Sequence, residues 1–362
     1  MSSAPSATSP SRAPRAGGAG PPPGPAAPQR HLAGPRAGTQ VPLKSVATTG
    51  PSNEVPPGVA PGAPAAPGGI PAEAPFVPRP AHNVFEAQLV LARQGLSPGS
   101  IDGVLGSQTR SALRAFQEQE HLSPTGELDG ATRARLVLTV PPLTDYTITT
   151  NDLERLEPVS PTWLGKSEQD RLDYETILEL IAEKAESHPR LIQRLNPEIH
   201  WTNVLAGTRV QVPNVAPPPI REKAALLRID LSSKTLEAFD ANTNLLAHFP
   251  CSIARFVEKR PVGELHVVAV ASNPVYIFDP ENFPESEEGR RLGRKLALPP
   301  GPNNPVGTAW ISLDRPGYGI HGTPKPEDVG RTESHGCFRL ANWNANWLLQ
   351  LVNVGIPVYV EP

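Results

Sequence analysis

The feature that most limits how this chain can fold is the composition of its first 80 residues. They contain 20 of the 46 prolines, 11 glycines, 16 alanines and one aromatic side chain, Phe76. Such a segment buries too little apolar surface to offset the conformational entropy that ordering costs, and its prolines favour extended conformations. We therefore expect residues 1–80 to form a disordered spacer. The rest of the 362 residues suffices for two or three compact units.

Charge and cysteine content exclude several classes of protein. The formal net charge of −3 gives no reason to expect nucleic acid or an anionic membrane as a partner. The chain has no run of 18 apolar residues, so we expect no transmembrane helix, and residues 1–20 lack the apolar core of a secretion signal. The two cysteines, Cys251 and Cys337, are too few for a disulfide-dense scaffold.

Residues 81–140 contain a short internal repeat. The frame G-x-L-x-x-x-T-R-x-x-L begins at Gly103 and again at Gly126. Glycine suits a tight turn and the threonine of each frame can cap a following helix, so the pattern predicts a small three-helix unit. The stretch from Ile101-Asp102-Gly103 to Phe116-Gln117 resembles the helical peptidoglycan-binding domain of cell-wall hydrolases. The resemblance implies that the module as a whole binds, while its turn residues are structural.

Residues 141–172 are polar and interrupted by proline, and we interpret them as a linker. In residues 173–214, which we call the LysM-like segment, apolar side chains recur at helical spacing on both sides of His188-Pro189. The order of elements is similar to that of a LysM repeat: two helices, then Asn196-Pro197, then the sequence G-T-R-V-Q-V-P, which ends at Pro213. That resemblance implies a βααβ fold that binds glycan chains containing N-acetylglucosamine. A degenerate repeat that serves as a rigid spacer is the alternative.

Residues 222–362 have the pattern of a mostly-β domain with one late helix. Short β-favouring runs alternate with turn-forming residues, and Asn342 can cap a helix over Trp343–Val352. The predicted strands are Ala225–Leu231, Thr235–Phe239, Leu245–Ser252, Leu265–Val270, Thr308–Leu313, Gly319–His321 and Val358–Val360. The fold class we predict is therefore multidomain: a small all-α module, a βααβ LysM-like segment, and this mostly-β domain.

The residues most suited to chemistry lie between His321 and Cys337. His321-Gly322-Thr323 and His335-Gly336-Cys337 place two histidines, two glycines and a cysteine within a short stretch of the last domain. A nucleophilic cysteine needs a base or an imidazolium to hold it as a thiolate near neutral pH. A glycine beside it lets the substrate approach the exposed backbone N–H. The pattern therefore favours a cysteine nucleophile.

Two other interpretations of these residues stay open at this point. Two histidines and a cysteine can bind zinc, although His266 is the only further candidate ligand and the usual second pair of ligands is missing. A cysteine in an apolar strand is more often a small buried hydrophobic residue, which is our interpretation of Cys251.

The sequence H-G-T…S-H-G-C-x-R-L, from His321 to Leu340, resembles the signature of the L,D-transpeptidase catalytic domain, the YkuD type. Asn304-Pro305-Val306-Gly307-Thr308 and Val354-Gly355-Ile356-Pro357-Val358 fall where that family has similar residues. The resemblance implies a nucleophile, a proton donor and acceptor oriented by a backbone carbonyl near Gly322, an oxyanion pocket and substrate-binding residues. The nucleophile would be Cys337, and the proton donor and acceptor would be His321. His335 and Gly336 would form the oxyanion pocket. The substrate-binding residues would be Arg339, Gly322 and Ser334.

The reaction that the resemblance implies is acyl transfer on peptidoglycan stem peptides through a thioester, without metal or cofactor. A second stem as acceptor gives a 3→3 cross-link, water gives an L,D-carboxypeptidase, and a protein lysine attaches a protein to the wall. The partners we expect are therefore stem peptides and glycan strands, with a wall-anchored protein as an alternative acyl acceptor. The expected location is the cell envelope, and the expected role includes cell shape. Residues 81–214 would tether the catalytic domain to the wall. A non-catalytic wall-binding protein is the alternative from another class.

Overall fold

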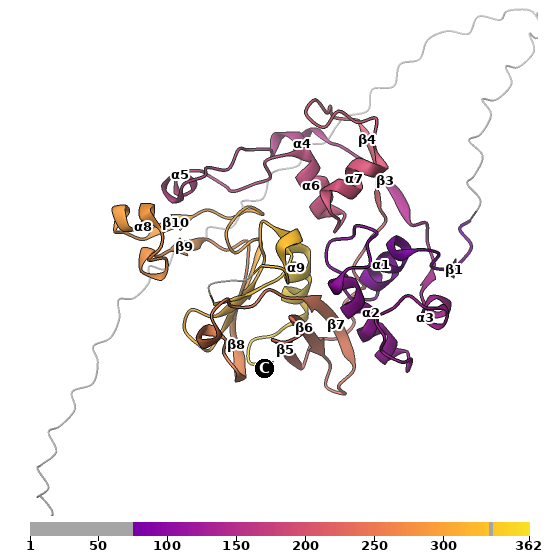
Figure 1. Ribbon diagram of the computed structural model, residues 1–362. Coiled ribbons are helices and arrows are strands. Elements are labelled where there is room, and N and C mark those ends of the chain that lie inside the picture. Colours follow the sequence, from indigo (N-terminus) through magenta and orange to yellow (C-terminus); the bar gives the residue numbers. More distant parts are fainter. Residues whose placement is uncertain (1–74, 333–335) are drawn as a thin grey trace, which may run out of the picture. The chain divides into compact units, whose positions relative to one another are not determined.

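The structure is a computed structural model that describes residues 75–332 and 336–362 (Figure 1). Most of the predicted spacer therefore lies outside the described residues. Its last six residues, 75–80, are described. Among them β1 (Arg79–Pro80) pairs antiparallel with β2 (Val137–Leu138), so the folded part begins before residue 81. Within the described ranges, no helix is long and apolar enough to cross a bilayer.

The first module is helical, as predicted. Its apolar faces meet in a core that includes Leu91, Leu113 and Phe116, each at most 1% exposed. Asn83 and Asp129 accept backbone N–H groups at the starts of the first and third helices. The helices are α1 (Val84–Arg93), α2 (Ser107–Gln119) and α3 (Gly130–Arg135).

The internal repeat has a structural basis that differs from the predicted threonine caps. Gln88 donates to the hydroxyl of Thr109 at 3.0 Å, and Gln117 donates to that of Thr132 at 2.8 Å. The other amide atom of each glutamine accepts the N–H of the first glycine of the repeat. The N-cap residues are instead a glycine and an aspartate. The repeated threonines therefore satisfy two buried glutamines rather than two helix ends.

The LysM-like segment contains the two predicted helices, but its first strand lies earlier than expected. β3 pairs antiparallel with β4 over five residues, and β3 falls inside the predicted linker. The local sequence pattern does not reveal this strand, because its partner β4 lies far along the chain. In chain order the elements from β3 to β4 are β3 (Leu143–Thr147), α4 (Thr150–Glu154), α5 (Trp163–Ser167), α6 (Ile177–Lys184), α7 (Pro189–Leu195) and β4 (Arg209–Pro213).

The rest of the predicted linker is also folded, and it packs on the last domain. The Trp163 ring stacks on Phe278 with 4.3 Å between centroids, and Glu288 accepts the N–H groups of Trp163 and Leu164 at 2.9 Å. A flexible connection would make no such contacts. The elements concerned are α5 (Trp163–Ser167), the paired strands β9 (Tyr276–Phe278) and β10 (Leu296–Leu298), η2 (Pro280–Asn282) and α8 (Glu287–Leu292).

The last domain is mostly β, as predicted, and is built on a mixed sheet. Within the described residues this sheet has eight strands, in the order β13-β12-β11-β8-β14-β5-β6-β7. β12 with β13 and β14 with β5 are parallel, whereas the other neighbours are antiparallel. The strands are β5 (Leu226–Asp230), β6 (Thr235–Phe239), β7 (Leu245–Pro250), β8 (Gly263–Ser272), β11 (Ala309–Leu313), β12 (Gly319–His321), β13 (Phe338–Arg339) and β14 (Pro357–Glu361).

The predicted late helix is α9 (Asn342–Leu351), which packs against the sheet (Figure 1). Its Trp347 and Leu348 join Phe249, Ile311 and other strand residues in the main core. The predicted cap is wrong, because Ala341 holds the N-cap position and no side chain caps this end. Two short 3₁₀ turns, η1 (Val257–Lys259) and η3 (Pro326–Asp328), lie in the loops around the sheet.

The helical module contacts the last domain through the turn after α1. The N–H of Ser97 donates to His248 at 2.8 Å, and the N–H of His248 donates to Gly95 at 3.0 Å. Asn344 of α9 donates to the Ser97 hydroxyl at 2.9 Å. These backbone contacts fix the turn against β7.

Candidate active site

The predicted histidine and cysteine lie on neighbouring parallel segments of the chain. Ile320 lies opposite Phe338 and His321 opposite Arg339, so Cys337 immediately precedes the strand that is paired with the histidine strand. The Cys337 thiol contacts the Gly317 carbonyl oxygen at 3.5 Å. Of the other predicted site residues, Gly322 and Gly336 flank this pair in the chain. Ser334 and His335 lie outside the described residues.

His321 is held in one orientation. It is 6% exposed, and its Nδ1 lies 2.6 Å from the Gly322 carbonyl oxygen. A carbonyl only accepts, so Nδ1 carries the hydrogen, and in the neutral ring Nε2 has the free lone pair. Trp310 stacks on the ring at 5.4 Å and 19°, and its own Nε1 donates to Ser312.

Burial favours the uncharged form of both side chains. Burial lowers the pKa of His321 to about 4, with a smaller contribution from the Arg339 charge. Burial also raises the pKa of Cys337 to about 11, despite a backbone hydrogen bond from Gly319 and the same arginine. These pKa values make a neutral thiol and a neutral imidazole the resting forms near pH 7.

Arg339 adjoins this pair at the end of β13. Its side chain is half-buried and donates to the Thr332 hydroxyl at 3.2 Å. Its backbone exchanges two hydrogen bonds with Ser252, at 2.9 and 3.0 Å. These backbone hydrogen bonds hold the residue that carries the guanidinium in place. Thr332 lies on the loop that connects His321 to Cys337.

The other chemically suggestive residues lie elsewhere. Cys251 is fully buried, and burial raises the pKa of its thiol to about 12, which fits a small hydrophobic residue. His266 contacts the carboxylates of Asp314 at 3.2 Å and Glu264 at 3.3 Å.

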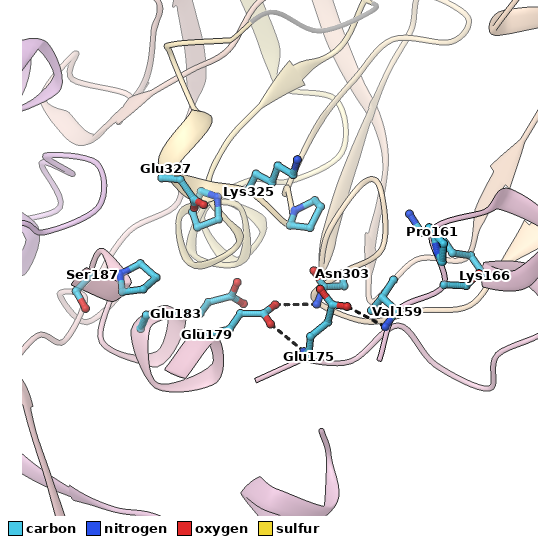
Figure 2. Close-up of a pocket in the computed structure, with 15 residues that line it drawn as sticks. Val159, Pro161, Lys166, Glu175, Glu179, Glu183, Ser187, Asn303, Lys325 and Glu327 are labelled. Carbon is cyan, nitrogen blue, oxygen red and sulfur yellow. Dashed lines mark hydrogen bonds between the residues drawn. The ribbon is translucent and has the colours of Figure 1, made fainter. Parts of the chain in front are cut away.

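A cavity of about 410 Å³ adjoins the loop that follows the histidine (Figure 2). It lies among the predicted linker, the LysM-like segment and the loops around residues 303 and 324–327. Its charged lining residues are Lys166, Glu175, Glu179, Glu183, Lys325 and Glu327. No local pattern in the sequence indicates this cavity, because its walls come from four separate parts of the chain.

Asn342 is the residue near the site that the sequence placed wrongly. Instead of capping α9, its buried side chain accepts the N–H of Thr308 at 3.3 Å and donates to Glu183 at 3.0 Å. An asparagine at a helix start is ordinarily interpreted as a cap, so no local signal pointed to these partners.

Comparison with known families finds two matches. Residues 224–360 match the L,D-transpeptidase catalytic domain of the YkuD type, and residues 81–136 match a peptidoglycan binding domain.

Curated proteins named as L,D-transpeptidases are similar to this chain. YkuD of Bacillus licheniformis is 26% identical over 188 residues, which is 51% of this chain and 93% of that protein. YqjB of Bacillus subtilis is 36% identical over 106 residues, 28% of this chain and 51% of that protein. A protein of Fuscovulum blasticum, from the region of its ATP synthase subunits, is 30% identical over 135 residues, 37% of this chain and 68% of that protein.

Among solved structures, L,D-transpeptidase 3 from Mycobacterium tuberculosis matches 44% of this chain and 77% of its own, with 18% identity and a TM-score of 0.30. This likeness is too distant to bear on the mechanism.

Proposed function

Because this chain belongs to the L,D-transpeptidase family, we propose that Cys337 attacks a carbonyl of a peptidoglycan stem peptide and forms a thioester. The protein is an enzyme of this class that also carries a peptidoglycan-binding domain. The observation that supports the proposal is the pairing of β12 with β13: Cys337 immediately precedes β13, and the neighbouring β12 ends in His321, whose ring is oriented and unprotonated.

Acylation begins as the sulfur of Cys337 bonds to the carbonyl carbon at the L-centre of meso-diaminopimelate. Since the resting thiol is neutral, its proton passes to Nε2 of His321 during the attack. The oxyanion that forms accepts hydrogen bonds from the backbone around Gly336 and Cys337, with His335 as part of the same pocket. The imidazolium then protonates the amine of D-alanine as its C–N bond breaks, and the thioester remains.

Deacylation repeats these steps with an acceptor. The side-chain amine of a second stem attacks the thioester, gives up a proton to His321 and forms a 3→3 cross-link, and the thiol is restored. Water or a protein lysine can take the same place. Arg339 holds a stem carboxylate by paired hydrogen bonds, while Gly322 and Ser334 contact the stem. The helical module and the LysM-like segment bind the wall, which places the enzyme in the cell envelope.

Acylation by a carbapenem tests the proposal, because its strained lactam carbonyl imitates the scissile amide. The intact mass should rise by one drug mass, and Cys337→Ala should abolish the adduct. A Cys251→Ala variant is the matched control, because it removes the other thiol and should acylate normally. An adduct that persists in Cys337→Ala, or that maps to Cys251, would overturn the assignment.

Location is tested by fractionating cells that express the full genomic locus. We expect the protein in the envelope fraction. If it is found solely in the cytosol, cross-linking of peptidoglycan is not its physiological role.

A further inference from the structure

The side chain of Asn342 is buried against the loop that holds the histidine. It is 0% exposed, and its oxygen lies against two glycines. A Cβ atom added at Gly322 would lie 2.2 Å from that oxygen, and one added at Gly307 would lie 2.0 Å from it. Both are well inside van der Waals contact, so any larger residue would displace the amide. Asn342 therefore sets the position of the Gly322 backbone.

The Gly322 backbone in turn sets the orientation of the imidazole. The Gly322 carbonyl accepts the Nδ1 hydrogen of His321 at 2.6 Å, and the Gly322 N–H donates to Ala309 at 3.2 Å. Movement of this peptide would turn the ring and change the direction in which Nε2 points. Catalytic efficiency is sensitive to such displacement, because a misplacement of about 1 Å can cost about a hundredfold in rate.

Asn342 is itself held from outside the catalytic domain. Its Nδ2 donates to a carboxylate oxygen of Glu183 at 3.0 Å and to the Pro302 carbonyl at 3.2 Å. The other oxygen of Glu183 accepts the Tyr174 hydroxyl at 2.9 Å. Glu183 lies on α6, so a residue of the LysM-like segment fixes the amide that supports the histidine loop.

A second set of contacts joins the same two parts of the chain. Asn303 donates to the Glu179 carboxylate at 2.7 Å, shown as a dashed line beside Glu183 in Figure 2. The N–H of Asn303 donates to the Leu172 carbonyl, and the N–H of Leu172 donates to Pro300, both at 2.9 Å. Residues 300–308 lead into β11, whose Trp310 stacks on His321. Through Glu179 and Asn303, the LysM-like segment thus also contacts the stretch of chain that leads to Trp310.

We propose that Glu183 is a positioning residue for catalysis: through Asn342 it holds the Gly322 carbonyl that orients His321. The LysM-like segment then completes the active site instead of only tethering it. This inference rests on the proposed function to the extent that His321 is the base.

The test measures carbapenem acylation in the full chain, with the first-order rate at saturating drug separated from the half-saturating concentration. Glu183→Leu should lower that rate about tenfold to a hundredfold and change the half-saturating concentration little. Glu183→Gln keeps an oxygen to accept from Asn342 and an amide to donate to Tyr174, so it should restore most of the rate. Glu175→Gln, a charge change on the same cavity without a contact to Asn342, is the matched control and should acylate as wild type.

A double-variant cycle distinguishes positioning from general damage. Asn342→Ala should lower the same rate constant, and adding Glu183→Leu to it should cost little more, because both act through one contact. If Glu183→Leu does not fold, Asn342→Ala is compared with wild type instead: a lowered acylation rate supports the inference, and a wild-type rate overturns it. Losses that multiply in the double variant, or a wild-type rate in either folded single variant, would overturn the inference. Failure of the wild-type protein to acylate would instead contradict the proposed function.

Discussion

The most direct test of the neutral pair is the pH dependence of Cys337 alkylation. With a pKa of about 11 against an ordinary value of 9.0, about one Cys337 in ten thousand is a thiolate at pH 7, compared with about one in a hundred for a model thiol. Iodoacetamide reacts with the thiolate, so the folded protein should react about a hundredfold more slowly than the model thiol at pH 7.

The assay follows the mass of a Cys251→Ala variant, which leaves Cys337 as the only thiol. In the folded protein the alkylation rate should still rise about tenfold per pH unit near pH 10. In denaturant the rate should level off near pH 9.0, the ordinary pKa of the thiol. Replacing a neutral imidazole removes no charge, so His321→Ala should leave this profile almost unchanged. It should nevertheless slow carbapenem acylation by about a hundredfold or more. A plateau below pH 8 in the folded protein that His321→Ala abolishes would refute the neutral pair in favour of a thiolate–imidazolium pair.

Three further predictions concern the surroundings of the pair. Gly322→Ala places a methyl group on the Asn342 oxygen, so acylation should fall about tenfold or more while far-UV circular dichroism is unchanged; a wild-type rate would contradict the tight fit. Burial raises the pKa of Glu183 from 4.5 to about 7, so the folded state keeps a proton that the unfolded state releases, and stability falls as pH rises through that window. In urea unfolding, the free energy of unfolding of Glu183→Gln should increase relative to that of wild type by up to about 3 kcal/mol as the pH rises from 4 to 8. An equal pH dependence of stability in both proteins would refute the raised pKa of Glu183. Deleting residues 81–214 should weaken pull-down on sacculi and, because Glu183 is lost, also slow turnover of a soluble stem peptide; unchanged turnover by the folded remainder would contradict the role of Glu183.

The titration of Glu183 depends on more than its burial. The Tyr174 hydroxyl and Asn342 donate to the carboxylate and oppose the rise in pKa, Glu179 adds to it, and Arg155 opposes it. The comparison with Glu183→Gln isolates this residue, because those neighbours are the same in both proteins.

The sequence was informative where the determining contacts are local. The strands and the late helix follow from alternating β-favouring residues and helical spacing, and His321 and Cys337 stand out as a short motif. The errors share one cause. β3 looked like linker because β4 lies far along the chain, and Asn342 looked like a cap because its partner Glu183 is 159 residues away. The pKa of Cys337 depends on how much protein surrounds the thiol, which no local pattern encodes.

The turn between α1 and α2 has a consequence for solubility. β7 is the last strand on its side of the sheet, and an unpaired outer strand offers free N–H and C=O groups to any extended chain that approaches it. Here Gly95 and Ser97 occupy the N–H and C=O of His248. A shortened protein that kept only residues 222–362 would expose these groups. It should therefore tend to self-associate through β7 even if its catalytic pair stayed intact.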